Sequence, residues 1–110
     1  MKTVILDENL PVDLRLSLAE FQVVTVHYQG WAGVSNGELV NLVDGQFDVF
    51  VTGDKKLRYQ QNLLNRKAAI VELPFTRLAS LVPLLEKIGK AIRDAAPGSY
   101  TQILPENDAL

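Results

Sequence analysis

The sequence predicts a three-layer α/β/α domain, in which helices cover both faces of a mostly parallel five-stranded sheet. Short apolar segments rich in β-branched residues alternate with segments of helical periodicity, which is the pattern of successive β–α units. Apolar residues make up 47% of the 110 positions, enough for one hydrophobic core with little surplus for a second domain. We therefore expect a single domain over residues 1–110, of which 104–110 form a polar tail.

The first β–α unit begins almost at the start of the sequence. Residues 3–6 are apolar or β-branched, as in a strand that is buried on both faces. Pro11 follows, and a proline is well tolerated in the first turn of a helix, where its missing N–H would have no partner. This helix should run to about Glu20. Residues 22–27 have strong β-propensity and predict the second strand.

A second helix is predicted after the loop that contains Trp31. Ser35 or Asn36 can serve as its N-cap, and Glu38, three residues after Ser35, completes a capping box. Gly45 is placed to end this helix.

The second half of the chain continues the alternation. Residues 47–52 predict the third strand, and a helix should follow at once and extend through Leu64. Residues 68–73 predict the fourth strand, which a proline ends. The longest helix is expected over 76–95, where apolar residues recur at helical spacing. A last short strand is expected over 99–104.

The composition excludes several classes of site. The absence of cysteine rules out disulfides, thiolate chemistry and cysteine-type zinc sites, and the single histidine, His27, has no visible catalytic partner. A net charge of −2 is not that of a generic nucleic-acid binder, although a local basic patch can hold RNA when a metal also bridges its phosphates. No window approaches the roughly 18 apolar residues of a membrane span, so we expect a cytoplasmic protein without an export signal.

Polar residues follow two of the predicted strands. The first strand runs into residues 7–9 (Asp-Glu-Asn), and the third ends in residues 52–54 (Thr-Gly-Asp). The carboxyl ends of parallel strands lie at one edge of a sheet, where ligands bind. Asp7 and Asp54 should therefore face each other if the two strands are neighbours. Two nearby carboxylates repel unless they share a proton or hold a cation, and oxygen ligands without His or Cys favour Mg²⁺ or Mn²⁺.

Each of these aspartates also has a simpler interpretation. Asp54 could be the N-cap of the helix that follows it, and Asp7 could belong to a turn, for which Asp-Glu-Asn is well suited. Their placement at two strand ends of one sheet favours a shared site over two separate structural roles.

Three segments of the chain carry a resemblance to a known family. They read Val-Ile-Leu-Asp-Glu-Asn-Leu-Pro at 4–11, Ser-Asn-Gly-Glu-Leu at 35–39 and Asp-Val-Phe-Val-Thr-Gly-Asp-Lys-Lys-Leu at 48–57. Together they resemble the compact PIN-like family, predicted nucleases related to the VapC ribonuclease toxins of bacterial toxin–antitoxin pairs. The resemblance covers residues 3–104. It implies a PIN fold, a metal-dependent ribonuclease activity, an RNA substrate and a cognate antitoxin.

The resemblance also implies roles for individual residues around a Mg²⁺ or Mn²⁺ ion, which would generate hydroxide and stabilise charge on the scissile phosphate. Asp7 matches the acidic residue that ends the first strand, and Asp54 matches the aspartate of the family's Thr-x-Asp segment. Thr52 matches the threonine that orders this loop, and Asn9 is expected to help order the site. The expected catalytic residues are Asp7, Asp54 and Glu8.

One position departs from the family's pattern. Many relatives carry an aspartate at the start of the second helix, where this chain has Asn36, which offers a carbonyl oxygen without a charge. Larger PIN domains also supply an acid from a helical segment that this chain lacks. Glu8 or Glu38 could compensate, although Glu38 could instead belong to the capping box. The expected metal ligands are Asp7, Asp54, Asn36 and Glu38.

Several side chains could contact RNA. Lys55, Lys56 and Arg58 follow the Thr-x-Asp segment and could hold phosphates, or they could form a solvated helix face. Trp31 could stack on a base, or it could anchor in the core or at an interface. Further cationic candidates are Arg66, Lys67 and Arg77.

Two other functions remain open. A non-catalytic PIN-like module that binds a partner is favoured by Asn36, and the apolar face of the long helix could serve a homodimer or an antitoxin. A response-regulator receiver domain has a similar sheet and would use Asp7 and Glu8 as the acidic pair after its first strand and Asp54 as its phosphorylated aspartate. It also needs a lysine after its last strand, where this chain reads Leu-Pro-Glu at 104–106.

Overall fold

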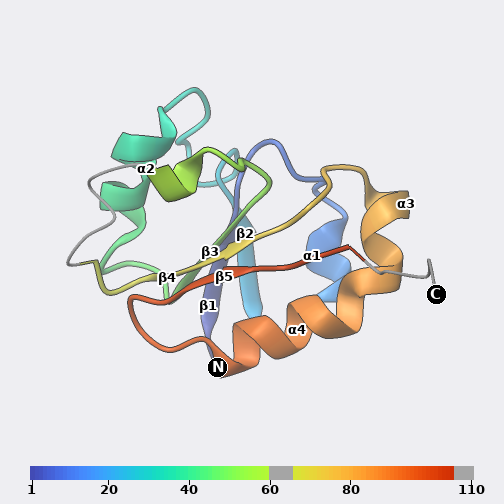
Figure 1. Ribbon diagram of the computed structural model, residues 1–110. Helices are drawn as coiled ribbons and strands as arrows, with labels where there is room; N and C mark the ends of the chain where they lie inside the picture. Colours follow the sequence, from blue (N-terminus) through green and yellow to red (C-terminus); the bar gives the residue numbers. More distant parts are fainter. Residues whose placement is uncertain (60–65, 106–110) are drawn as a thin grey trace.

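All five strands run parallel in one sheet, in the order β2-β1-β3-β4-β5 (Figure 1). The computed structural model describes residues 1–59 and 66–105. The strands are β1 (Thr3–Leu6), β2 (Gln22–Thr25), β3 (Val49–Thr52), β4 (Ala69–Glu72) and β5 (Tyr100–Gln102). The predicted parallel sheet is confirmed, and β1 and β3 are neighbours in it, with Leu6 beside Val51.

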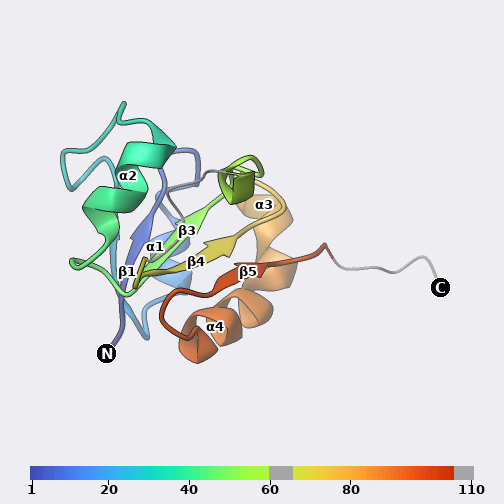
Figure 2. The same ribbon diagram turned by 60° about the vertical axis from the view of Figure 1, so that its left-hand side comes forward.

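Helices cover both faces of the sheet, which completes the predicted three-layer α/β/α architecture. The α-helices are α1 (Leu14–Ser17), α2 (Asn36–Val43), α3 (Leu78–Leu81) and α4 (Leu85–Asp94). Two short 3₁₀ helices are η1 (Leu57–Tyr59) and η3 (Val82–Leu84). Figure 2 shows α2 on one side of the sheet and α4 on the other.

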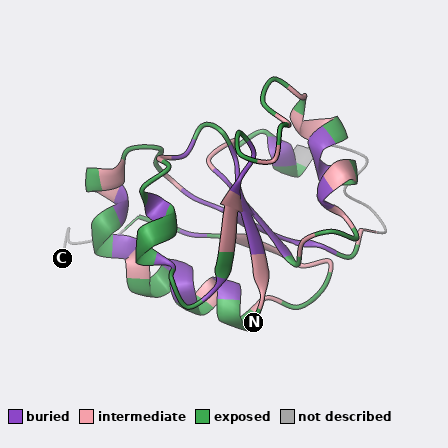
Figure 3. Cartoon of the chain, turned by 180° about the vertical axis from the view of Figure 1, so that it is seen from behind, coloured by how far each residue is buried: buried purple, intermediate pink, exposed green. Residues whose placement is uncertain are grey.

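Two apolar cores lie on opposite faces of the sheet, because successive residues of a strand point in opposite directions. Leu6 and Val51 face the core that contains α1 and α4. Ile5 and Phe50 face the core that contains α2. All four side chains are at most 1% exposed, and Figure 3 shows the buried central strands between helices whose outer faces are exposed. The apolar strands β1, β3 and β4 are therefore buried on both faces, whereas the edge strands β2 and β5 are partly exposed.

The long helix predicted over 76–95 is interrupted. It is divided into α3, η3 and α4, because Pro83 has no N–H to donate and lies at the start of η3. Ile88 and Ile92 of α4 are fully buried. The apolar stripe of this segment thus packs into the core of the chain itself.

The first predicted helix is also shorter than expected. The chain leaves the helical conformation at Leu18 (φ −115°, ψ 35°) and turns so that Leu18 and Phe21 both reach the core. Helix α2 begins after Ser35 as predicted, but the predicted capping box does not form, since Ser35 makes no side-chain cap hydrogen bond. Ser35 and Glu38 are both exposed, so water can satisfy the first N–H groups of the helix.

Asp54 is followed by a turn and then by η1, where the sequence predicted an α-helix beginning at once. Its Oδ1 accepts a hydrogen bond from the Lys56 N–H at 2.9 Å, so the carboxylate stabilises the turn. The predicted continuation of the helix through Leu64 lies in residues 60–65, outside the described residues.

Candidate functional site

The carboxyl ends of β1 and β3 form the switch point of the sheet. From β1 the chain crosses to β2 on one side, and from β2 it crosses back to β3 on the other side of β1. Ligands of open parallel sheets bind outside the strand ends at such a point. Asp7 directly follows β1 and Thr52 ends β3, so the sequence-predicted acidic cluster lies at this position.

Asp7 is a buried carboxylate, 4% exposed. Its Oδ2 accepts a hydrogen bond from the Thr52 hydroxyl at 2.7 Å, and its Oδ1 accepts one from the Glu8 N–H at 2.8 Å. Burial raises the pKa of Asp7 above its ordinary value of 3.8, the two hydrogen bonds oppose that shift, and the charges of Glu8 and Asp54 add to it. A cation at this position would therefore relieve an unfavourable burial of charge.

Asp54 is tied to the same threonine. Its backbone N–H donates to the Thr52 hydroxyl oxygen at 3.0 Å, while the Thr52 hydroxyl donates to Asp7. The side-chain amide of Asn36, at the start of α2, donates to Asp54 Oδ2. Thr52 thus links the two aspartates, and Asn36 fixes the orientation of Asp54. The structure brings together Asp7, Asp54, Thr52 and Asn36 from three separate segments, as the sequence predicted for the site.

Asn9 and Gly53 connect the two loops that carry the aspartates. Asn9 Oδ1 accepts a hydrogen bond from the Gly53 N–H at 3.3 Å. A Cβ at position 53 would lie 2.7 Å from Thr76 Cγ2 and 3.4 Å from Leu10 Cδ2, so the loop leaves no room for a side chain there. The predicted ordering role of Asn9 thus has a geometric basis.

Glu8 and Glu38 differ in their relation to the site. Glu8 is exposed and its Oε1 accepts a hydrogen bond from the Gly33 N–H at 3.1 Å, but its charge still acts on Asp7. Glu38 is exposed on the first turn of α2, whereas the charges that act on Asp7 are those of Glu8 and Asp54. Of the two, Glu8 is the acid that contributes to the electrostatics of the pair.

The donor set of the site is small. Within residues 1–59 and 66–105, no group of three or more His, Cys, Asp or Glu side chains is arranged to hold a metal ion. Mg²⁺, however, usually keeps several waters and is commonly bound by one or two carboxylates together with substrate phosphates. Asp7 and Asp54, linked through Thr52, supply the two carboxylates that such a mode of binding uses, whereas Asn36 turns its amide nitrogen toward Asp54.

Glu72 is a second buried carboxylate, which the sequence reasoning missed. It ends β4, is 1% exposed, and accepts hydrogen bonds from the Tyr100 hydroxyl at 2.6 Å and from Arg58 at 3.2 Å. Thr52, Glu72 and Gln102 are register neighbours across β3, β4 and β5. Burial, followed by the hydrogen bond to Glu72, raises the pKa of Tyr100 far above its ordinary 10.0, so the hydroxyl stays a donor. The sequence did contain a signal for this buried carboxylate, because Glu72 is an acidic residue near the end of an otherwise apolar predicted strand.

The three cations predicted to hold RNA have different surroundings. Lys55 and Lys56 are exposed on the turn that precedes η1. Arg58 instead donates to Glu72 Oε2 and to Gln102 Oε1, each at 3.2 Å. Its guanidinium is therefore part of the Glu72 network, whereas the two lysines face solvent beside the site.

Trp31 was predicted either to stack on a base or to anchor in the core. Trp31 packs edge to face on Phe47, with ring centroids 6.1 Å apart and planes at 85°, against the core on the α2 side. This contact supports the anchor interpretation over base stacking.

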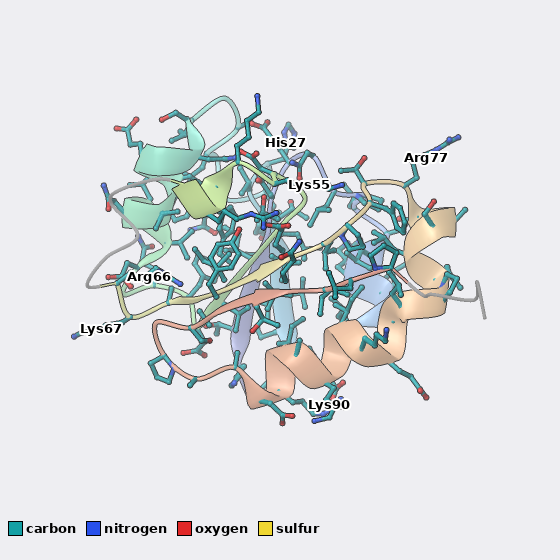
Figure 4. All side chains as sticks on the ribbon, in the orientation of Figure 1. His27, Lys55, Arg66, Lys67, Arg77 and Lys90 are labelled. Carbon is teal, nitrogen blue, oxygen red and sulfur yellow. The ribbon has the colours of Figure 1, made fainter. Side chains whose placement is uncertain are left out.

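Figure 4 shows His27, Lys55 and Arg77 along the edge where the strands end, while Lys67 lies away from it, just before β4.

Comparisons of this chain with protein-family models, with curated proteins and with solved structures found no match. Among the described residues, none of the helices is both long and apolar enough to cross a membrane.

Gly53→Ala tests the contact between the site loop and the loop after β4. We expect the added methyl to lower the free energy of unfolding by about 1 kcal/mol, because it must push Thr76 Cγ2 away. Thr76→Ser removes that methyl group, so the double variant should regain most of the loss. Thermal unfolding of both single variants and the double variant measures this. A Gly53→Ala protein as stable as wild type would contradict the close contact.

Proposed function

We propose that this chain is a Mg²⁺- or Mn²⁺-dependent ribonuclease of PIN-like type, the toxin of a toxin–antitoxin pair acting in the cytoplasm. The observation that carries the proposal lies at the switch point of the sheet. There the Thr52 hydroxyl links Asp7, which is buried, to the backbone of Asp54. The three PIN-like sequence segments support it, because they supply the linked residues. The proposed partners are RNA, a cognate antitoxin and a second copy of the chain.

Each residue of the site has a distinct task in this proposal. Asp7 and Asp54 would hold the ion, which would supply hydroxide and offset charge on the scissile phosphate. Thr52 fixes the Asp7 carboxylate and the Asp54 backbone, and Asn36 fixes the Asp54 carboxylate. Exposed Lys55 adds positive potential for the RNA backbone at the same edge.

A catalytically weakened PIN-like binding module is the second candidate. It is favoured by the donor set, since only two carboxylates pair at the switch point and no three-acid group occurs in the described residues. Such a module would bind metal or RNA weakly without cleaving.

The receiver alternative shares the strand order of this sheet. A receiver needs a lysine after its last strand, and the described part of this chain has none there. The residues at this position are Gln102, Ile103, Leu104 and Pro105. An acid-labile mass increase on Asp54 after incubation with a small phospho-donor would be needed to support it.

Cleavage of a single-stranded RNA of mixed sequence tests the proposal. We expect cleavage with Mn²⁺ and none with a chelator, and we expect Asp54→Asn to slow it by at least about 100-fold. Glu86→Gln, which neutralises an exposed carboxylate on α4, is the matched control and should cleave like wild type. Cleavage that survives the chelator or Asp54→Asn would contradict the proposal, and metal-dependent binding without cleavage would support the binding module.

A further inference from the structure

A pocket of about 320 Å³ adjoins the loop that carries Asp54. Gly53 and Lys55 form one wall, and residues 74–77 together with Ser80 form the other. The two walls meet where Gly53 lies against Thr76. The pocket thus opens one residue away from Asp54, and its volume is within the range of small-ligand pockets.

The lining of this pocket combines two cations with an aromatic ring. Lys55 comes from the site loop and Arg77 from the loop after β4, and both are exposed. In the part of the chain that the structure describes, neither takes part in an ion pair. Phe75, on the loop after β4, also lines the pocket and is 39% exposed, so part of its ring is accessible to a ligand. Figure 4 shows Lys55 and Arg77 at the same edge of the molecule.

We propose that this pocket binds the nucleotide next to the scissile phosphate of a single-stranded RNA. The inference rests on the proposed ribonuclease function and specifies how its substrate is held. The face of Phe75 stacks on the base, and Lys55 and Arg77 neutralise the phosphates on either side of it. Aromatic stacking and backbone charge recognise every base, so the pocket selects unpaired nucleotides without selecting a sequence.

The geometry favours single strands over duplexes. Bases in a duplex are stacked on one another, so their faces are not available to Phe75. A larger pocket of about 570 Å³ lies between α4 and β5, but it includes no residue of the loops that carry Asp7 and Asp54. Of these two pockets, the one beside Gly53 is therefore the one that can place a nucleotide against the metal site.

Fluorescence anisotropy with a labelled single-stranded RNA of about ten nucleotides, in chelator to prevent cleavage, tests this subsite. We expect Phe75→Leu to raise Kd by about 5- to 100-fold and Phe75→Tyr, which keeps the ring, to leave it nearly unchanged. Lys55→Gln and Arg77→Gln should each raise Kd and reduce the slope of log Kd against log salt by about 0.7. Lys67→Gln removes the same charge near the start of β4 and should match wild type.

The outcomes separate the pocket from the proposed function. RNA binding that is unchanged in Phe75→Leu and Arg77→Gln overturns the pocket, even if wild type cleaves RNA with Mn²⁺. The expected pattern of binding losses, seen with a wild type that never cleaves, supports the pocket and overturns the ribonuclease. A wild type that neither binds single-stranded RNA in chelator nor cleaves it with Mn²⁺ overturns both. Duplex RNA binding that falls equally in Phe75→Leu also overturns the pocket, because stacking requires an unpaired base.

Discussion

Asp7→Asn is expected to lower metal-dependent RNA cleavage by at least about 100-fold and, at neutral pH, to raise the stability of the fold. The loss of activity follows from the loss of one of the two anionic ligands paired through Thr52. The gain in stability follows because the substitution removes the charge of a residue that is only 4% exposed. That charge also lies near the charges of Glu8 and Asp54. Active sites commonly carry such costs, because function requires groups that folding alone would not favour.

The stability effect of Asp7 depends on pH in a defined direction. Burial raises the pKa of Asp7 above its ordinary 3.8, so the folded protein holds this proton more tightly than the unfolded chain does. The contribution of Asp7 to stability is therefore complete below a pH of about 4 and is lost as pH rises through the raised pKa. Asparagine does not titrate, so the advantage of the variant should grow over the same interval.

Thermal unfolding of wild type and Asp7→Asn across the acidic to neutral range measures this effect. We expect the variant to unfold at a higher temperature than wild type near neutral pH, because asparagine places no charge at this buried position. The advantage should shrink as pH falls toward about 4. Asp13→Asn, which neutralises an exposed carboxylate before α1, is the control and should show no such trend. A difference between Asp7→Asn and wild type that does not vary with pH would contradict the argument.

The sheet and its switch point could be predicted because their signals are local. The first strand was expected over 3–6, as found, since its apolar β-branched residues and the polar residues after it are adjacent in the sequence. The pairing of Asp7 with Asp54 then required only that β1 and β3 be neighbours. Helix lengths were predicted less well, because the apolar periodicity over 76–95 continues through Pro83 and indicates a single helix, although the missing N–H of Pro83 was a local signal of the break.

The partner of Arg58 could not be predicted from the sequence. Its position after Asp54 indicated a phosphate ligand, but Glu72 and Gln102 lie 14 and 44 residues further along the chain. Only the register of β3, β4 and β5 brings the ends of those strands side by side. Local sequence patterns indicate which residues end a strand. Which cation pairs with Glu72 depends instead on how the strands pair in the sheet.

Arg58→Ala is accordingly expected to act mainly on stability. Removing the guanidinium leaves the Glu72 carboxylate, which is 1% exposed, with the hydrogen bond that it accepts from the Tyr100 hydroxyl at 2.6 Å. Breaking a fully buried ion pair costs about 3–5 kcal/mol. Because the Arg58 side chain is 34% exposed, water weakens the pair, and we expect a loss of about 2–3 kcal/mol.

A double-mutant cycle distinguishes this role from simple loss of packing. Glu72→Gln keeps an acceptor for Tyr100 but carries no charge, so the Arg58→Ala/Glu72→Gln protein should be more stable than Arg58→Ala alone. Arg15→Ala, at an exposed arginine of α1, controls for the loss of an arginine side chain and should change the free energy of unfolding by less than about 0.5 kcal/mol. If the double variant were instead the less stable of the two, the charge of Glu72 would not be what Arg58 compensates. Arg58 would then have to be reconsidered as an RNA ligand, because the competing demand of Glu72 is what sets it apart from Lys55 and Lys56.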